Sequence, residues 1–160
     1  MLEKIRAQWT KVIHPFALGL LKLGVTPDMV TWTGTIATII VALVFFPQGW
    51  LWQGVAVLAL FIFSDSLDGT MARESGSSSK WGAFLDSTLD RLADGAIFGG
   101  IAIYYAAQPD GLLWCAVAIG ALVFALVTSY SKARGESVGI EVHAGFAGRA
   151  DRLLVGLLGV

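Results

Sequence analysis

The feature that most constrains the fold of this chain is a series of long apolar segments separated by short polar turns. The segments run over residues 30–46, 51–73, 81–107 and 112–131. A helix needs about 20 predominantly apolar residues to cross the hydrocarbon core of a bilayer. The composition agrees, because 56% of the 160 residues are hydrophobic and only 14% are charged, whereas a soluble domain has about 25% charged residues. The sequence therefore predicts an all-α integral membrane protein built as a transmembrane helix bundle.

The two ends of the chain differ from these segments. Residues 1–22 alternate polar and apolar side chains at helical spacing and carry four cations, which is typical of an amphipathic helix lying in the membrane interface. A packed helix with one solvated face is the alternative. At the other end, a fifth apolar segment begins at Arg149 and stops at Val160, too short to cross a bilayer. We therefore expect one transmembrane domain over residues 23–160 that lacks a natural C-terminal part.

Positive charge is distributed asymmetrically among the connections between the segments. All 11 Lys and Arg residues lie within residues 4–22, 73–91 and 132–152. The opposite connections, at residues 47–50 and 107–111, contain none. By the positive-inside rule, the N-terminus and the region between the second and third segments face the cytoplasm. We expect a multi-pass protein of the inner (plasma) membrane with its functional region on the cytoplasmic side.

Four aspartates lie at the ends of the second and third segments, where a membrane helix ordinarily excludes charge. Asp65 and Asp68 are three residues apart, and Asp86 and Asp90 are four residues apart. On a helix both spacings place the side chains on one face. The short loop at residues 74–79 makes the two helices antiparallel neighbours. The four carboxylates can therefore converge near the cytoplasmic ends of these helices.

A cluster of this kind needs a partner, because each ionised Asp near the centre of a membrane helix costs about 2.5–3.5 kcal/mol. Carboxylate oxygens without His or Cys favour Mg²⁺, Mn²⁺ or Ca²⁺ over zinc. Four carboxylates can hold two divalent ions, which is the arrangement that clamps both oxygens of a phosphoryl displacement. One alternative is a set of helix-end acids paired with Arg73, Lys80 and Arg91. Another is a divalent-cation transporter, although acids near one membrane face rather than the midplane argue against it.

Small residues and one cation flank the acids. Gly69 and Gly82 each lie within four residues of an aspartate, and Ala72 is similarly small. Glycine has no side chain and lets a bulky group approach the backbone. Arg73 supplies a fork of donors that suits a diphosphate. Close packing between helices is the alternative explanation for the two glycines.

Eight of these residues stand together in one pattern, Asp65-x2-Asp68-Gly69-x2-Ala72-Arg73-x8-Gly82-x3-Asp86-x3-Asp90. The pattern resembles the complete signature of the CDP-alcohol phosphatidyltransferases. The resemblance implies a homodimeric membrane enzyme of six helices, of which about four and a half are present here. Such enzymes transfer a phosphatidyl or similar group from a CDP-linked donor to an alcohol and release CMP.

The same resemblance assigns roles to the acids. Asp65, Asp68, Asp86 and Asp90 match the metal-binding carboxylates of the family, which implies two Mg²⁺ ions, with Mn²⁺ as a substitute. Asp90 matches the carboxylate that acts as general base on the acceptor hydroxyl, a role that needs hydrogen-bond reach of the alcohol. The spacing alone does not distinguish Asp90 from Asp86 for this role.

Further residues match the positions that contact the CDP-diacylglycerol donor. By resemblance, the CDP site is lined by Gly69, Ala72, Arg73 and Gly82. Before the first span the family often has Thr-Pro-Asn-x2-Thr, and here Asp28 and Thr31 stand in a Thr-Pro-Asp-x2-Thr sequence. Asp in place of Asn keeps an acceptor for the nucleotide but loses an amide donor. Ser79 is a candidate phosphate contact, with an ordinary loop serine as the alternative.

Cations after the fourth segment bear on the acceptor. Lys132, Arg134 and Arg152 lie on the predicted cytoplasmic side, and an acceptor that bears its own phosphate needs such residues. Anchoring of the helix ends is the alternative role. The SYxKAR sequence at residues 129–134 is similar to that of the bacterial members that make phosphatidylinositol phosphate. The resemblance therefore implies inositol 1-phosphate as acceptor, with glycerol 3-phosphate as the alternative.

Overall fold

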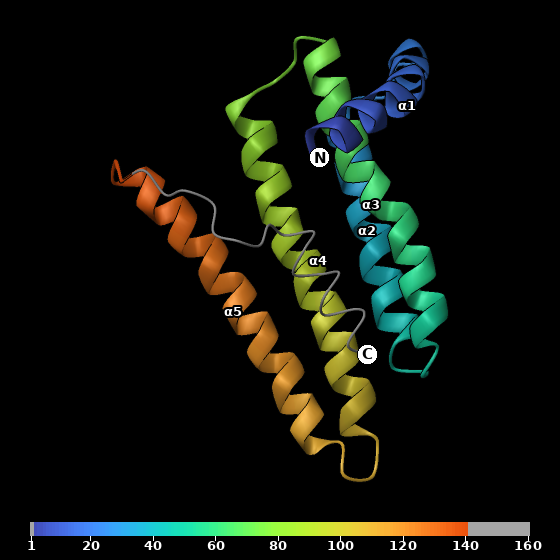
Figure 1. The fold of residues 1–160 in the computed structure, drawn as a ribbon, viewed down its shortest axis with the longest axis vertical. Coiled ribbons are helices and arrows are strands. Elements are labelled where there is room, and N and C mark those ends of the chain that lie inside the picture. Colours follow the sequence, from blue (N-terminus) through green and yellow to red (C-terminus); the bar gives the residue numbers. More distant parts are fainter. Residues whose placement is uncertain (1, 141–160) are drawn as a thin grey trace. The chain divides into compact units, whose positions relative to one another are not determined.

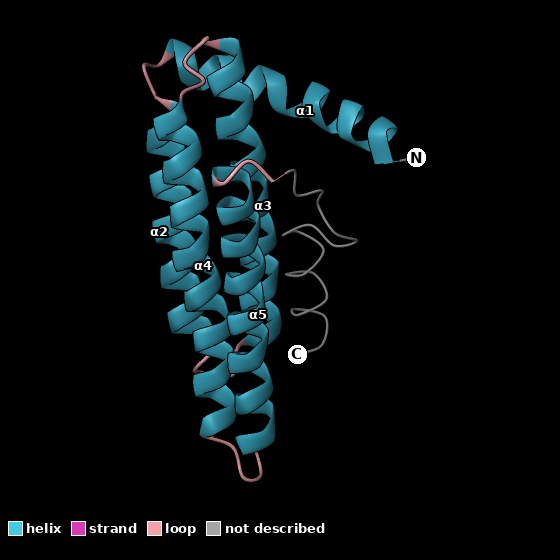
Figure 2. Ribbon diagram, turned by 90° about the vertical axis from the view of Figure 1, so that its left-hand side faces the viewer, coloured by secondary structure: helices cyan, strands magenta, loops and turns pink. Residues whose placement is uncertain are grey.

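The computed structural model describes the backbone of residues 2–140 and their side chains except those of residues 2–11 and 62–66. These residues form five α-helices and no strand (Figure 1). The helices are α1 Leu2–Lys22, α2 Pro27–Phe45, α3 Leu51–Glu74, α4 Lys80–Ala106 and α5 Leu112–Ser137. Short loops join successive helices (Figure 2). The predicted all-α fold is confirmed, and the start of each helix lies within three residues of the predicted start.

The end of α5 is one point where the sequence prediction was wrong. The fourth apolar segment, over residues 112–131, predicted a helix that ends at about residue 131, whereas the helix continues to Ser137. Lys, Ala, Arg and Glu are favourable helix formers, and Lys132 Nζ lies 3.9 Å from Glu136 Oε1 at an i, i+4 spacing that supports a helix. The helix ends where Gly139 adopts a φ of 80°, a left-handed conformation common after helix C-termini.

The chain divides into two compact units. The first comprises Met1–Val41 and Ala56–Ala93, and the second comprises Ala42–Val55 and Asp94–Val160. The first unit contains α1, most of α2, most of α3 and the first half of α4. It therefore holds all the residues predicted to bind metal or nucleotide. Its buried apolar side chains include those of Met71, Leu85 and Leu89.

The second unit packs its helices through small residues. A Cβ atom added to Gly100 of α4 would lie 2.5 Å from the carbonyl oxygen of Ala42 in α2. A Cβ atom added to Gly54 of α3 would lie 2.7 Å from the ring of Phe46, which is completely buried. Small residues at helix interfaces allow the close approach that stabilises helix pairs in membranes.

Large apolar side chains face outward along the helices. Two helices of the described segment, α2 and α5, are long and apolar enough to cross a membrane by length and composition. Exposed apolar residues on α5 include Leu112, Leu113 and Phe124. On α1, Ile13 and Ala17 are buried, but Phe16 is 67% exposed. A soluble monomer rarely exposes apolar patches of this extent, so these surfaces suit a lipid environment.

Candidate functional site

A polar cavity of about 280 Å³ opens in the first unit, where α2, α3 and α4 meet. All seven residues that the sequence assigns to the nucleotide line its wall: Asp28, Thr31, Gly69, Ala72, Arg73, Ser79 and Gly82. Two of the four predicted metal ligands, Asp68 and Asp86, line it as well. Residues from three helices that are far apart in the sequence thus face one space.

Asp68 is the most enclosed acid of this cavity. Asp68 is 7% exposed, and both oxygens of its carboxylate accept hydrogen bonds. The hydroxyl of Thr31 donates to Oδ2 at 2.6 Å, and the backbone N–H of Gly69 donates to Oδ1 at 2.5 Å. Asp68 on α3 is therefore connected to α2 through a side chain 37 residues earlier in the chain.

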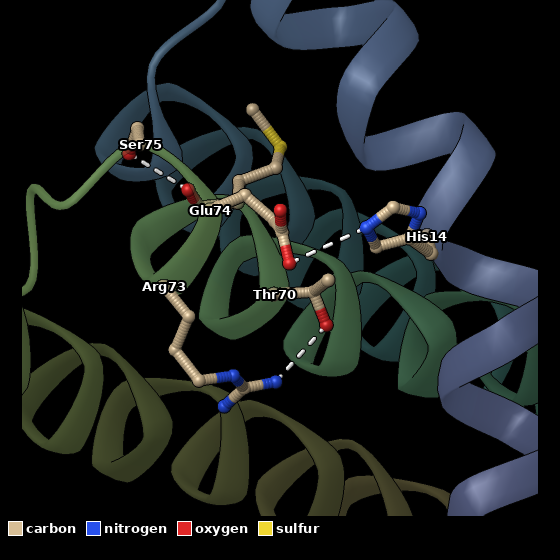
Figure 3. A network of polar contacts seen from close by, with 6 residues as sticks. His14, Thr70, Arg73, Glu74 and Ser75 are labelled. Carbon is tan, nitrogen blue, oxygen red and sulfur yellow. Dashed lines mark hydrogen bonds and ion pairs between the residues drawn. The ribbon is translucent and has the colours of Figure 1, made fainter.

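The last turn of α3 carries the cation of the cavity. Arg73 donates through Nη2 to the hydroxyl of Thr70 at 3.1 Å, and Thr70 itself is buried. The neighbouring Glu74 extends to another side of the helix, where its carboxylate lies 3.3 Å from Nε2 of His14 in α1 (Figure 3). The guanidinium group of Arg73 thus lies against the cavity wall rather than pairing with this neighbouring carboxylate.

The N-terminus of α4 forms the opposite wall. Ser79 precedes the helix, and its hydroxyl accepts the N–H of Gly82 at 2.9 Å, as a helix N-cap does. Ser79 therefore has a structural role that the sequence analysis did not predict, in addition to facing the cavity. Asp28 lies in the first turn of α2. Two helix N-termini open here, and free N–H groups with the helix dipole favour anions at such ends.

The two glycines of the cavity do not serve close helix packing. A Cβ atom added to Gly69 would lie 3.8 Å from Nη1 of Arg73, and among the described residues no backbone atom of another helix would lie within 4 Å of it. At Gly82 the nearest atoms would be Ser79 Oγ at 3.4 Å and Asp28 Oδ1 at 3.8 Å. All of these atoms belong to side chains of the cavity wall. The alternative explanation by helix packing therefore does not apply at these two positions, whereas it does apply at Gly100.

The remaining predicted metal ligands are placed differently. Asp86 is exposed and lines the cavity. Asp90 lies one turn further along α4, and its Oδ2 is 3.6 Å from Nη2 of Arg91, which is one of the ion pairs that the alternative interpretation predicted. The side chain of Asp65 lies outside the described residues.

The donor chemistry of the cavity fits a divalent cation. Asp68 and Asp86 offer carboxylate oxygens, the ligands that Mg²⁺ and Mn²⁺ prefer. Among the side chains that the structure describes, which exclude Asp65, no group of three His, Cys, Asp or Glu residues is arranged to hold a metal ion. Asp68 and Asp86 thus offer two of the carboxylates that such a site would need.

The basic residues predicted to bind the acceptor phosphate belong to the second unit or lie outside the described residues. Lys132 and Arg134 are exposed residues near the end of α5. Lys132 pairs at 3.9 Å with Glu136, one helical turn away. Arg152 lies outside the described residues.

Sequence reasoning missed some lining residues and a whole second cavity. Ser77 and Ser78 also line the polar cavity, and their place beside Ser79 in a serine-rich loop was the only available signal. A larger cavity of about 690 Å³ lies between α1 and α3 of the first unit. Its lining is apolar and comprises Val12, Ile13, Pro15, Phe16, Gly19, Leu20, Leu23 and Leu67. Nothing in the sequence indicates this cavity, because it depends on how α1 packs.

Comparison with known proteins gives one consistent result. The family model for CDP-alcohol phosphatidyltransferase matches residues 24–159. The phosphatidylinositol phosphate synthase of Cutibacterium acnes is 57% identical over 160 residues, covering 100% of this chain and 77% of the relative. The enzyme of the same name from Streptomyces avermitilis is 53% identical, covering 99% of this chain and 66% of the relative.

Two solved structures are also similar to this chain. The crystal structure of Mycobacterium tuberculosis phosphatidylinositol phosphate synthase with CDP-DAG bound has a TM-score of 0.88 and 42% identity, covering 93% of this chain and 75% of that one. The structure of the same enzyme with manganese and citrate has a TM-score of 0.87 and 42% identity, covering 92% and 70%.

Proposed function

Because the chain belongs to the CDP-alcohol phosphatidyltransferase family, we propose that it transfers the phosphatidyl group of CDP-diacylglycerol to inositol 1-phosphate. The chain is a membrane transferase of phospholipid biosynthesis. The products of the proposed reaction are phosphatidylinositol phosphate and CMP. The observation that carries the proposal is the polar cavity, which collects all seven predicted donor contacts and two of the acids in one place.

In the proposed reaction the cavity holds the CDP part of the donor. Arg73 presents its guanidinium group to the diphosphate, and the N-termini of α2 and α4 add N–H groups and dipole charge that favour the same anion. Gly69 and Gly82 leave the backbone open to the nucleotide. The acyl chains of a lipid donor need apolar walls, and the apolar cavity between α1 and α3 supplies them. One of its lining residues, Leu67, directly precedes Asp68.

The chemical step exchanges the phosphoanhydride bond of the donor for a phosphodiester bond. Asp90 removes the proton of the acceptor hydroxyl, whose oxygen forms a bond to the phosphorus that carries diacylglycerol. The bond from that phosphorus to the CMP oxygen breaks, and CMP leaves. We assign Asp65, Asp68, Asp86 and Asp90 to two Mg²⁺ ions, for which Mn²⁺ substitutes. When bound, these ions neutralise the charge that develops on the phosphate oxygens. Manganese in a relative's structure supports this assignment.

The acceptor is the finer part of the proposal. Lys132, Arg134 and Arg152 supply the cations that an acceptor phosphate requires. The relatives named phosphatidylinositol phosphate synthase support inositol 1-phosphate over glycerol 3-phosphate. The proposal includes an active site on the cytoplasmic side of the inner membrane. All 11 Lys and Arg residues lie within residues 4–22, 73–91 and 132–152, on the predicted cytoplasmic side. The proposal also includes a homodimer, which light scattering of the detergent-solubilised protein would test.

An acceptor screen tests the function. Purified protein in detergent with CDP-diacylglycerol and Mg²⁺ is given inositol 1-phosphate, glycerol 3-phosphate or unphosphorylated inositol, and CMP release is measured. We expect release with inositol 1-phosphate alone. Preference for glycerol 3-phosphate would show that glycerol 3-phosphate, rather than inositol 1-phosphate, is the acceptor. No CMP release with any alcohol would reject the transferase function of this chain.

The role of Asp90 has its own test. Asp90→Asn keeps the shape of the side chain but removes the base, so CMP release should fall by a factor of about 100 or more. The fold and much of the Mn²⁺ affinity should survive, because the other three assigned carboxylates remain. Retained CMP release in this variant would exclude Asp90 as the base.

A further inference from the structure

We propose that Thr31 is a positioning residue, which orients the carboxylate of Asp68 toward the metal ion. This inference rests on the proposed function, because it assumes that Asp68 is a metal ligand. The sequence places Thr31 only among the donor contacts. The structure adds a direct link, because its hydroxyl donates to Asp68 Oδ2 at 2.6 Å from a different helix.

The geometry at Asp68 matches what a metal-binding carboxylate needs. Each of its oxygens accepts a hydrogen bond, from Thr31 at Oδ2 and from the Gly69 N–H at Oδ1. Asp68 also lines the cavity, so its carboxylate borders the space in which a cation would bind. Two fixed donors on different oxygens also prevent rotation of the group. Hydrogen bonds of this kind orient metal ligands, and their loss costs metal affinity.

The hydroxyl of Thr31 has one proton and two candidate acceptors. The carbonyl oxygen of Pro27 lies 3.1 Å away in the preceding turn, and Asp68 Oδ2 lies 2.6 Å away. A distance near 2.6 Å is typical of a hydroxyl that donates to an ionised carboxylate, which is the stronger bond. The proton is therefore directed at Asp68. The position of the side chain is restricted as well, because the β-branched Thr has few χ1 rotamers.

Thr33 provides an internal contrast on the same helix. Its hydroxyl donates to the carbonyl oxygen of Met29 at 2.7 Å and is exposed. That bond is the ordinary one for a threonine within a helix. Thr31 and Thr33 are thus two threonines two residues apart, of which only Thr31 lines the cavity beside Asp68. A change at Thr33 controls for the general effect of removing a hydroxyl from α2.

The test measures metal binding without turnover. Mn²⁺ is titrated into the purified protein without substrates, and free Mn²⁺ is measured by electron paramagnetic resonance. Thr31→Val keeps the shape of the side chain and removes the proton donor, so the dissociation constant should rise about 10–100-fold. Thr31→Ser restores the hydroxyl and should return the constant to near the parent value. Thr33→Val should leave it unchanged.

Kinetics separate this role from a nucleotide contact. In Thr31→Val the Mg²⁺ concentration that gives half-maximal CMP release should rise, while the KM for CDP-diacylglycerol at saturating Mg²⁺ stays near that of the parent. Parent-like Mn²⁺ binding together with a raised donor KM would overturn the proposal and leave Thr31 as a nucleotide contact. Thr31→Ala, which adds no atoms, gives the same comparison if Thr31→Val lacks the parent's melting transition.

The outcome for Thr31 is separate from that for the proposed function. If the parent protein binds Mn²⁺ but releases no CMP with any acceptor, the transferase proposal fails. The Mn²⁺ constants of the three variants still decide whether Thr31 orients Asp68. If the parent protein does not bind Mn²⁺, the positioning role is rejected, whichever acceptor the enzyme uses.

Discussion

Replacing Gly69 or Gly100 by alanine should change stability in opposite directions. Both glycines lie inside helices, where alanine is favoured over glycine by about 0.5–1 kcal/mol. At Gly69 the added Cβ atom meets, among the described residues, Arg73 Nη1 at an ordinary contact distance of 3.8 Å. At Gly100 it would lie 2.5 Å from the carbonyl oxygen of Ala42 and 3.2 Å from its carbon, both of which are backbone atoms.

These contacts set the expected magnitudes. Gly69→Ala keeps the helix preference and should stabilise the protein by about 0.5–1 kcal/mol. Gly100→Ala forces α2 and α4 apart, and overpacking costs about 1–3 kcal/mol, which more than offsets that preference. For a chain of this length 1 kcal/mol corresponds to about 2–4 °C in melting temperature. The two variants should therefore melt on opposite sides of the parent protein.

Activity should change in the reverse order. The methyl group added by Gly69→Ala enters the cavity proposed for CDP and clashes with the donor. A loss of about 1.4 kcal/mol in binding free energy from this clash lowers kcat/KM about tenfold. Gly100→Ala should retain the parent donor KM at temperatures where it stays folded. Melting is measured by tryptophan fluorescence in detergent, and kinetics by CMP release. An equal loss of melting temperature in both variants would contradict the difference between the two glycines. A parent-like kcat/KM in Gly69→Ala would contradict the place of Gly69 in the donor cavity.

Three further predictions follow from single contacts. Ser79→Ala removes the cap on the Gly82 N–H and should lower the free energy of unfolding by about 1 kcal/mol, measured by thermal denaturation; no change would exclude a capping role. Lys132→Ala should raise the KM of inositol 1-phosphate in the CMP assay without affecting the donor KM, whereas an unchanged acceptor KM would leave it an anchoring charge. His14→Ala should change stability by less than about 1 kcal/mol, because its pair with Glu74 is about 40% exposed. A larger loss would show that α1 docking depends on this pair.

Local sequence was sufficient for the helices and for most of the residues that line the polar cavity. A helix has a fixed rise and rotation per residue, so the spacing of Asp65, Asp68, Asp86 and Asp90 predicts their faces without any knowledge of packing. The error at the end of α5 arose because glycines suggested a loop, while the helix formers and the Lys132–Glu136 pair continue the helix. The long signature made the family recognisable before any coordinates, and the comparisons agree.

The order of amino acids alone therefore predicts the class of fold, the family and a group of residues along individual helices. The packing of the helices shows which of these residues share one cavity, that Thr31 contacts Asp68 across 37 residues of sequence, and that Gly69 and Gly100 have different neighbours. The physical reason is that regular backbone geometry relates residues within one helix. Contacts between helices depend instead on how side chains of separate segments pack, and no local pattern encodes that.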